Sequence, residues 1–247
     1  MMEYLLNFLL GLGIGLIAGL FGVGGGFLIV PTLTFTGVPM NIAIGTSLAC
    51  ITISSLSSAA MHMREGRVLY RVALLTAAFS IPMAVLGSYA STMVDEKILR
   101  ILFAILLLYL AYSFTKHKDR RNPEDEEPAA DIKYSRVPFI GAFSGVASGL
   151  LGVSGGIINV PFFHNLARIP LKYAVGTSSF ALFFTSLAAA YTHYTLGQVD
   201  IIITLTVTPG LIIGSLIGAY LVSKVPSEKL KIGFAGLLVI IALKMLL

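Results

Sequence analysis

The residues with the clearest chemical potential lie in a ten-residue stretch that occurs twice. Residues 22–31 have the sequence GVGGGFLIVP and residues 152–161 have GVSGGIINVP, so six of the ten positions are identical. Each copy places a glycine cluster and then a proline inside an apolar run, which predicts an interruption between two helical segments. The first turn of a helix has backbone N–H groups without intrahelical acceptors and a partial positive charge, so such a break can bind an anion. The candidate anion cradle consists of Gly24, Gly25, Gly26, Ser154, Gly155 and Gly156.

A simpler interpretation of these glycines stays open at this point. Small residues also allow close contact between helices in membranes. That interpretation accounts less well for glycine clusters that are followed by Pro31 and Pro161 in both copies. Asn159, a polar residue one turn beyond the second cluster, favours a polar cavity.

Other polar side chains recur with the same spacing. The tripeptide Gly-Thr-Ser occurs at residues 45–47 and 176–178, and its hydroxyls are candidate donors to the same anion. These candidate ligands are Thr46, Ser47, Thr177 and Ser178. Hydroxyls in membrane helices also bond to their own backbone, so a structural role competes with this assignment.

His62 and His193 lie at the ends of two apolar segments. Histidine titrates near neutral pH, so both are candidates for gating or proton relay, with an interfacial cap as the alternative. No Asp or Glu lies well inside an apolar segment, so a buried carboxylate relay is not indicated. The single cysteine, Cys50, excludes a cysteine metal site, and no GxxxxGK[ST] loop is present. We therefore expect no cofactor, no bound metal and no ATP hydrolysis.

The composition indicates the kind of protein that positions these residues. Hydrophobic residues make up 56% of the chain and charged residues 12%, with a mean hydropathy of +0.90. This composition predicts an all-α polytopic membrane protein. The net charge of +5 lies in short clusters between apolar runs, which indicates membrane orientation rather than nucleic-acid binding. The first apolar run lacks a basic start, so we expect it to be kept rather than cleaved as a signal peptide.

Hydropathy divides the chain into two halves of five segments each. The predicted segments are residues 4–21, 26–37, 40–62, 68–91 and 97–114, then 137–151, 156–168, 171–194, 199–222 and 227–246. The halves, residues 1–115 and 137–247, flank a charged linker at residues 116–136. Segments two and seven are too short to cross a membrane alone, so we expect them to be half-spanning or re-entrant after the glycine breaks.

The two halves form an internal repeat with an offset close to 131 residues, and loop charge predicts that the copies are inverted. Five crossings per half place fourteen of the 17 Lys and Arg residues on the inner side, including those of the linker. Only Lys97, Arg100 and Lys244 fall outside. Basic loops favour the cytoplasmic side, so the linker is expected to be cytoplasmic.

The two glycine stretches, the two Gly-Thr-Ser tripeptides and the central charged linker resemble the TauE/SafE sulfite exporter family of membrane transporters. The resemblance covers essentially the whole chain, in order and with both copies present. It implies multi-pass transport of a small sulfur-containing anion or organosulfur acid, such as sulfite or a sulfonate, across a plasma membrane. It also implies that the glycine breaks, the Gly-Thr-Ser elements and Asn159 are substrate-site positions. The resemblance does not determine which anion is moved, the direction of transport, the coupling ion or whether the protein forms a homodimer.

Three alternatives to a secondary transporter follow from the same residues. A passive anion channel would use the same dipole-lined site. A rhomboid-like intramembrane serine protease would use Ser154 as nucleophile and His193 as base, because residues 152–155 match a Gly-x-Ser-Gly pattern. The absence of tryptophan and the presence of Gly24 at the equivalent position in the first copy argue against this enzyme. A non-transporting scaffold is disfavoured by the broken helices.

Overall fold

A computed structural model describes residues 2–21, 26–116, 132–222 and 227–246. Within these ranges the chain forms helices and connecting loops, without a strand. The helices are α1 (Met2–Phe21), α2 (Gly26–Phe35), α3 (Met40–Arg64), α4 (Tyr70–Met93), α5 (Glu96–Lys116), the 3-10 turn η1 (Tyr134–Arg136), α6 (Val137–Leu151), α7 (Gly155–Asn165), α8 (Leu171–Thr195), α9 (Ile201–Val222) and α10 (Ser227–Leu246). The all-α prediction is confirmed for this part of the chain, and the predicted segments match the helices to within three residues.

The helices have the length and surface of a membrane-embedded protein. Among the described residues, four stretches are long and apolar enough to cross a membrane: Met40–Arg64, Tyr70–Met93, Leu171–Thr195 and Ile201–Gly218. Shorter apolar stretches occur in α1, α2 and α10. Large apolar side chains such as Leu86, Ile105 and Leu216 are more than half exposed, which suits surfaces that contact lipid.

The two helices that follow the glycine stretches are short, as predicted. α2 has 10 residues and α7 has 11, so each extends about 15 to 17 Å, roughly half of a membrane core about 30 Å thick. Pro31 and Pro161 lie inside these helices, so the interruption itself falls at the glycines. α2 is buried at eight of its ten residues, so it lies inside the bundle rather than against lipid.

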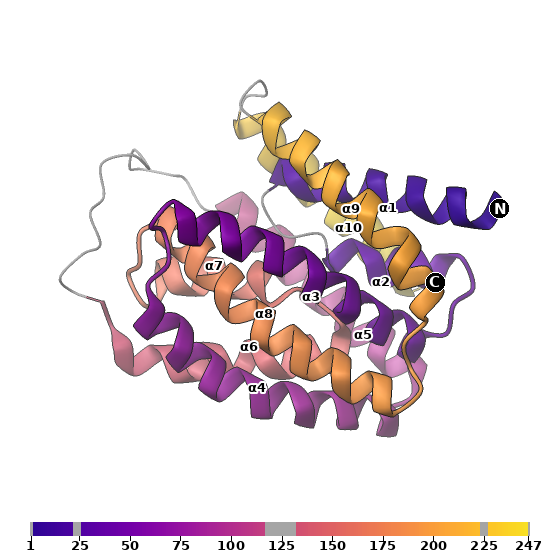
Figure 1. The fold of residues 1–247 in the computed structure, drawn as a ribbon, viewed down its shortest axis with the longest axis horizontal. Coiled ribbons are helices and arrows are strands. Elements are labelled where there is room, and N and C mark those ends of the chain that lie inside the picture. The colour runs from indigo at the N-terminus through magenta and orange to yellow at the C-terminus, as the bar shows by residue number, and fades with distance from the viewer. Residues whose placement is uncertain (1, 22–25, 117–131, 223–226, 247) are drawn as a thin grey trace.

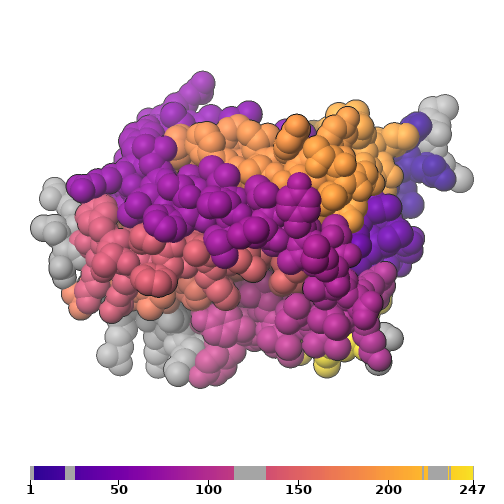
Figure 2. Space-filling view, turned by 90° about the horizontal axis from the view of Figure 1, so that it is seen from below, coloured from indigo at the N-terminus to yellow at the C-terminus, as the bar shows by residue number. Residues whose placement is uncertain are grey.

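Long helices of one half pair with helices of the other half (Figure 1). α1 packs along α9, and α6 packs along α4. Glycines permit both contacts, because a Cβ on Gly11 would collide with the carbonyl of Val207 and a Cβ on Gly141 with the carbonyl of Thr76. Figure 2 shows the result on one face, where purple first-half residues lie next to orange and pink second-half residues. The two halves are therefore interleaved.

α3 and α8 are equivalent in the repeat and lie side by side (Figure 1). Gly45, near the start of α3, contacts the backbone of Gln198 just beyond the end of α8. Gly176, near the start of α8, contacts the backbone of Arg67 just beyond the end of α3. The two helices therefore run antiparallel, and the two contacts are copies of each other at an offset of 131 residues.

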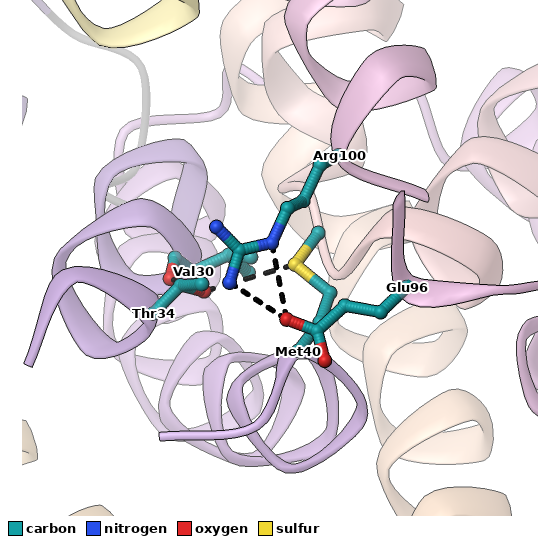
Figure 3. Close-up of polar contacts among 5 residues, drawn as sticks. All are labelled: Val30, Thr34, Met40, Glu96 and Arg100. Carbon is teal, nitrogen blue, oxygen red and sulfur yellow. Dashed lines mark hydrogen bonds and ion pairs between the residues drawn. The ribbon is translucent and has the colours of Figure 1, made fainter. Parts of the chain in front are cut away.

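The far end of α2 is fixed by short-range contacts (Figure 3). The Thr34 hydroxyl donates to the carbonyl of Val30 at 2.8 Å and lies 3.7 Å from the sulfur of Met40 at the start of α3. The close-up also draws the Glu96–Arg100 ion pair in the first turns of α5, in which Nη2 lies 2.7 Å from Oε1. Because α2 is tied to α3 here, its N-terminal end is held at a defined place inside the bundle.

Candidate anion site at the helix breaks

The second break is a sharp turn between α6 and α7. α6 ends at Leu151, Gly152 adopts the left-handed conformation with φ of 67°, and its N–H donates to the carbonyl of Ser148 at 2.8 Å. Glycine is required there, because a Cβ would also lie 2.8 Å from the Cα of Ile44. α7 then begins at Gly155, and Ser154 before it makes no side-chain capping bond. The N–H of Ile157 donates to the carbonyl of Ser154 at 3.1 Å, and the N–H groups of Gly155 and Gly156 are left for another acceptor.

The start of α2 lies directly against this break. A Cβ on Gly26 would lie 3.1 Å from the Cβ of Ser154 and would collide with the side chain of Ile51. The hydroxyl of Ser47 on α3 lies 3.1 Å from the carbonyl oxygen of Gly26 and 2.9 Å from that of Gly152. The two copies of the glycine stretch thus meet inside the bundle. Gly24 and Gly25 lie outside the described residues.

Four buried polar side chains gather around the second break without a partner among the residues that the structure describes. The atoms are the hydroxyls of Ser148, Ser154 and Ser178 and the side-chain oxygen of Asn159. All four residues are at most 2% exposed. Buried polar groups nearly always have hydrogen-bond partners, so a polar ligand or water molecules bound here would complete these hydrogen bonds.

The positions of Gly155 and Gly156 show that these side chains surround the first turn of α7. A Cβ on Gly156 would lie 3.2 Å from the Ser154 hydroxyl and 3.7 Å from the Ser178 hydroxyl. A Cβ on Gly155 would lie 3.6 Å from the amide nitrogen of Asn159. Hydroxyl and amide groups from α7 and α8 therefore converge on the positive end of the α7 dipole.

Ser148 is the member of this group that the sequence prediction missed. It lies one turn after Ser144 on the same face of α6, and Ser144 Cβ would lie 3.9 Å from a Cβ on Gly155. The signal was present in the sequence, because a four-residue spacing of serines in an apolar helix points both to one face. The first copy has Ile14 and Ala18 at these positions.

Thr46 and Thr177 are bonded to loops in this structure. The hydroxyl oxygen of Thr46 accepts the N–H of Asp200 at 3.0 Å, and that of Thr177 accepts the N–H of Leu69 at 3.0 Å. Both acceptors and both donors are related by the repeat, so each threonine holds the loop before α9 or α4. Their role as substrate ligands stays a prediction.

The two histidines differ in their surroundings. His193 is fully buried, with Nε2 3.0 Å from the carbonyl oxygen of Gly149 and Nδ1 2.7 Å from the side-chain oxygen of Gln198. His62 is partly exposed, and its Nδ1 lies 3.6 Å from a carboxylate oxygen of Glu65. His193 thereby ties the end of α8 to α6, one turn before the break.

This arrangement bears on the protease alternative. A serine protease needs the nucleophile within hydrogen-bond reach of its base. Both ring nitrogens of His193 contact other groups, and the Ser154 hydroxyl has no partner among the described residues. Ser154 and His193 therefore do not form a catalytic pair in this structure.

The site is also free of charged side chains in the part of the chain described. The buried polar residues there are Ser, Thr, Asn and His, and the described ranges contain no group of metal-ligating side chains. Neutral donors at a helix N-terminus suit an anion that must bind and leave again.

Apolar helices of full length around two half-length helices, whose N-terminal ends meet inside the bundle, define a polytopic membrane protein with discontinuous helices. Many secondary transporters share this design. The family described as "Sulfite exporter TauE/SafE" matches residues 7–245, and the chain belongs to this family of membrane transporters. The resemblance noted in the sequence is thereby confirmed.

Individual relatives support the same class over their full length. The chain is 30% identical to a probable membrane transporter protein of Haemophilus influenzae, covering 98% of each chain. It is 29% identical to the probable membrane transporter protein MJ0441 of Methanocaldococcus jannaschii, covering 97% of this chain and 94% of the relative. It is also 29% identical to the probable membrane transporter protein YunE of Bacillus subtilis, covering 92% and 91%. No solved structure matches the chain.

Proposed function

We propose that this protein is a secondary transporter that moves a small sulfur-containing anion or organosulfur acid, such as sulfite or a sulfonate, across the plasma membrane. The family name supports the substrate class. The main support for the site is the group of unpartnered hydroxyl and amide atoms around the start of α7. These atoms belong to Ser148, Ser154, Asn159 and Ser178. Substrate oxygens would accept from the three serines and from the N–H groups of Gly155 and Gly156.

The mechanism we propose is alternating access between two inverted halves. Three observations support inversion: the antiparallel α3 and α8, the recurrence of contacts at the repeat offset, and the concentration of Lys and Arg on one set of loops. In this topology the linker at residues 116–136 is cytoplasmic and the two breaks meet near the midplane. His62 and His193 then lie toward opposite faces and are our candidates for gating or proton relay.

Binding and flux measurements test this proposal. Thermal unfolding of the purified protein with sulfite, sulfate, thiosulfate, taurine and sulfoacetate should show stabilisation by one or a few of these anions, because a ligand that binds the folded state stabilises it. Asn159→Ile should abolish this stabilisation, and isoleucine already occupies the equivalent position 29. If the anion stabilises the variant as much as the unmodified protein, the second break is not part of the site.

Flux in proteoliposomes separates a transporter from a passive channel. A carrier saturates with substrate and supports counterflow, in which unlabelled anion on one side drives labelled anion to accumulate from the other. Flux that stays proportional to concentration without counterflow would favour the channel.

A further inference from the structure

Ser47 makes a contact that joins the two copies of the repeat. Its hydroxyl is fully buried on α3, 3.1 Å from the carbonyl oxygen of Gly26 and 2.9 Å from that of Gly152. A hydroxyl has one proton, so the two carbonyls share it in a three-centre bond. Gly26 is the first residue of α2 in the first half, whereas Gly152 caps the C-terminus of α6 in the second. This single hydroxyl therefore holds both breaks in their present arrangement.

Ser178 is the counterpart of Ser47 at an offset of 131 residues, yet its hydroxyl is unengaged. It is 1% exposed and has no hydrogen-bond partner among the described residues. It lies beside Gly156, the counterpart of Gly26, with its oxygen 3.7 Å from the place of a Cβ there. Two equivalent serines in equivalent surroundings thus have different bonding states.

A carrier built from two equivalent halves has two states that are related by exchanging the conformations of the halves. We propose that the hydrogen bonds of Ser47 stabilise the state described here, and that Ser178 stabilises the opposite state by donating to the carbonyl of Gly156. Each serine is thus the latch of one state. The proposal rests on the alternating-access function proposed above. Ser47 and Ser178 act here as positioning residues, and whichever serine is not latched is free to donate to the substrate.

An introduced cysteine gives a test that needs no substrate. Thr192 on α8 is 5% exposed, whereas its counterpart Met61 on α3 is 50% exposed, so a cysteine at position 192 becomes exposed when the halves exchange conformations. In a Cys50→Ala, Thr192→Cys background, Ser47→Ala should speed labelling by N-ethylmaleimide about fivefold, the factor expected for loss of one neutral hydrogen bond. Ser178→Ala should slow it by a similar factor, because it destabilises the opposite state. An unchanged rate in Ser47→Ala, or equal acceleration in both variants, overturns the proposal.

Ser55 and Ser186 provide a matched pair of controls. They occupy equivalent positions on α3 and α8, both are buried, and each hydroxyl donates to a carbonyl of its own helix, Thr52 and Leu182 respectively. Ser55→Ala and Ser186→Ala remove the same atoms without touching a break. We expect both to leave the labelling rate of the cysteine at position 192 unchanged.

Sulfite transport gives a second readout that a plain substrate contact would not move. Apparent affinity from each side scales with the fraction of carrier open to that side. The ratio of half-saturating concentrations outside and inside should shift about fivefold in opposite directions in Ser47→Ala and Ser178→Ala, and return in the double variant. A loss of affinity equal on both sides in each variant contradicts the latch. Absence of sulfite transport by the unmodified protein counts against the proposed function alone, because the cysteine labelling still tests the latch.

Discussion

The start of α2 and the start of α7 have equivalent apolar neighbours, but they differ in the polar groups near them. A Cβ on Gly26 would meet Ile51, and a Cβ on Gly156 would meet Leu182, which occupies the equivalent place on α8. The residues at equivalent sequence positions near the two starts nevertheless differ in polarity. The pairs, first copy then second, are Ala18 and Ser148, Gly24 and Ser154, and Ile29 and Asn159. Apolar neighbours of the duplicated scaffold thus recur at both helix starts, while three side chains in the second copy supply the polar groups.

The contacts of the scaffold, in contrast, are the same in both halves. Thr46 and Thr177 each accept one loop N–H at 3.0 Å. Gly66 and Gly197 both have positive φ, 66° and 70°, at the turns after α3 and α8. The difference between the breaks is therefore local, and it can be tested by exchanging residues between the copies.

Converting the second break into the first should have the largest effect. The triple variant Ser148→Ala, Ser154→Gly and Asn159→Ile places first-copy residues at all three positions. The two lost serine hydroxyls each cost about 1.5 to 3 kcal/mol of hydrogen bonding to an anion, so sulfite affinity should fall at least 100-fold. Titration calorimetry of the purified protein measures this. Sulfite binding at unchanged affinity would show that the polar side chains of the second break are not ligands.

Adding one methyl group should lower stability at the start of α2 and weaken sulfite binding at the start of α7. In Gly26→Ala the new Cβ collides with Ile51, so we expect a loss of about 1 to 3 kcal/mol of stability. In Gly155→Ala the nearest atom is 3.4 Å away, so the fold should tolerate the Cβ, which then occupies the ligand space and weakens sulfite binding about tenfold. Thermal unfolding and sulfite titration of both variants measure the two effects. The reverse result, with Gly155→Ala unstable and Gly26→Ala unable to bind, would contradict the assignment.

The smallest effects should be equal in the two halves. Thr46→Val and Thr177→Val each leave a loop N–H without its acceptor, so each should lose about 1 kcal/mol of stability. We expect sulfite affinity to stay unchanged in both. A fall in affinity with unchanged stability would instead support the prediction that these threonines bind substrate. Denaturant or thermal unfolding with and without sulfite distinguishes the outcomes.

The sequence predicted the helices and their interruptions because both depend on local properties. Apolar runs located the helices, and the glycine cluster at residues 152–156 located the turn where Gly152 needs positive φ. The short α2 and α7 followed from counting apolar residues between the glycines and the next polar turn.

Features that depend on side-chain direction across the bundle could not be predicted from the sequence. Gly-Thr-Ser at residues 45–47 predicts two hydroxyls near an anion, but only the fold shows Thr46 bonded to the loop at Asp200 and Ser47 bonded to both breaks. Ser148 was missed because a serine in an apolar helix is commonly bonded to its own backbone. The pairing of α1 with α9 could not be predicted, because hydropathy gives no information on which apolar segments are neighbours.

The packing of α1 against α9 and of α4 against α6 has a consequence for biogenesis. The faces of α1 that carry Gly11 and Gly15 close onto the backbone of α9, whose residues are made almost two hundred positions later. α4 likewise waits for α6. The glycine face of α1 is covered by α9, so α1 must stay in the bilayer with lipid against that face until α9 has been made. The order of synthesis is therefore not the order of assembly, and completion of the bundle depends on contacts of very long sequence separation.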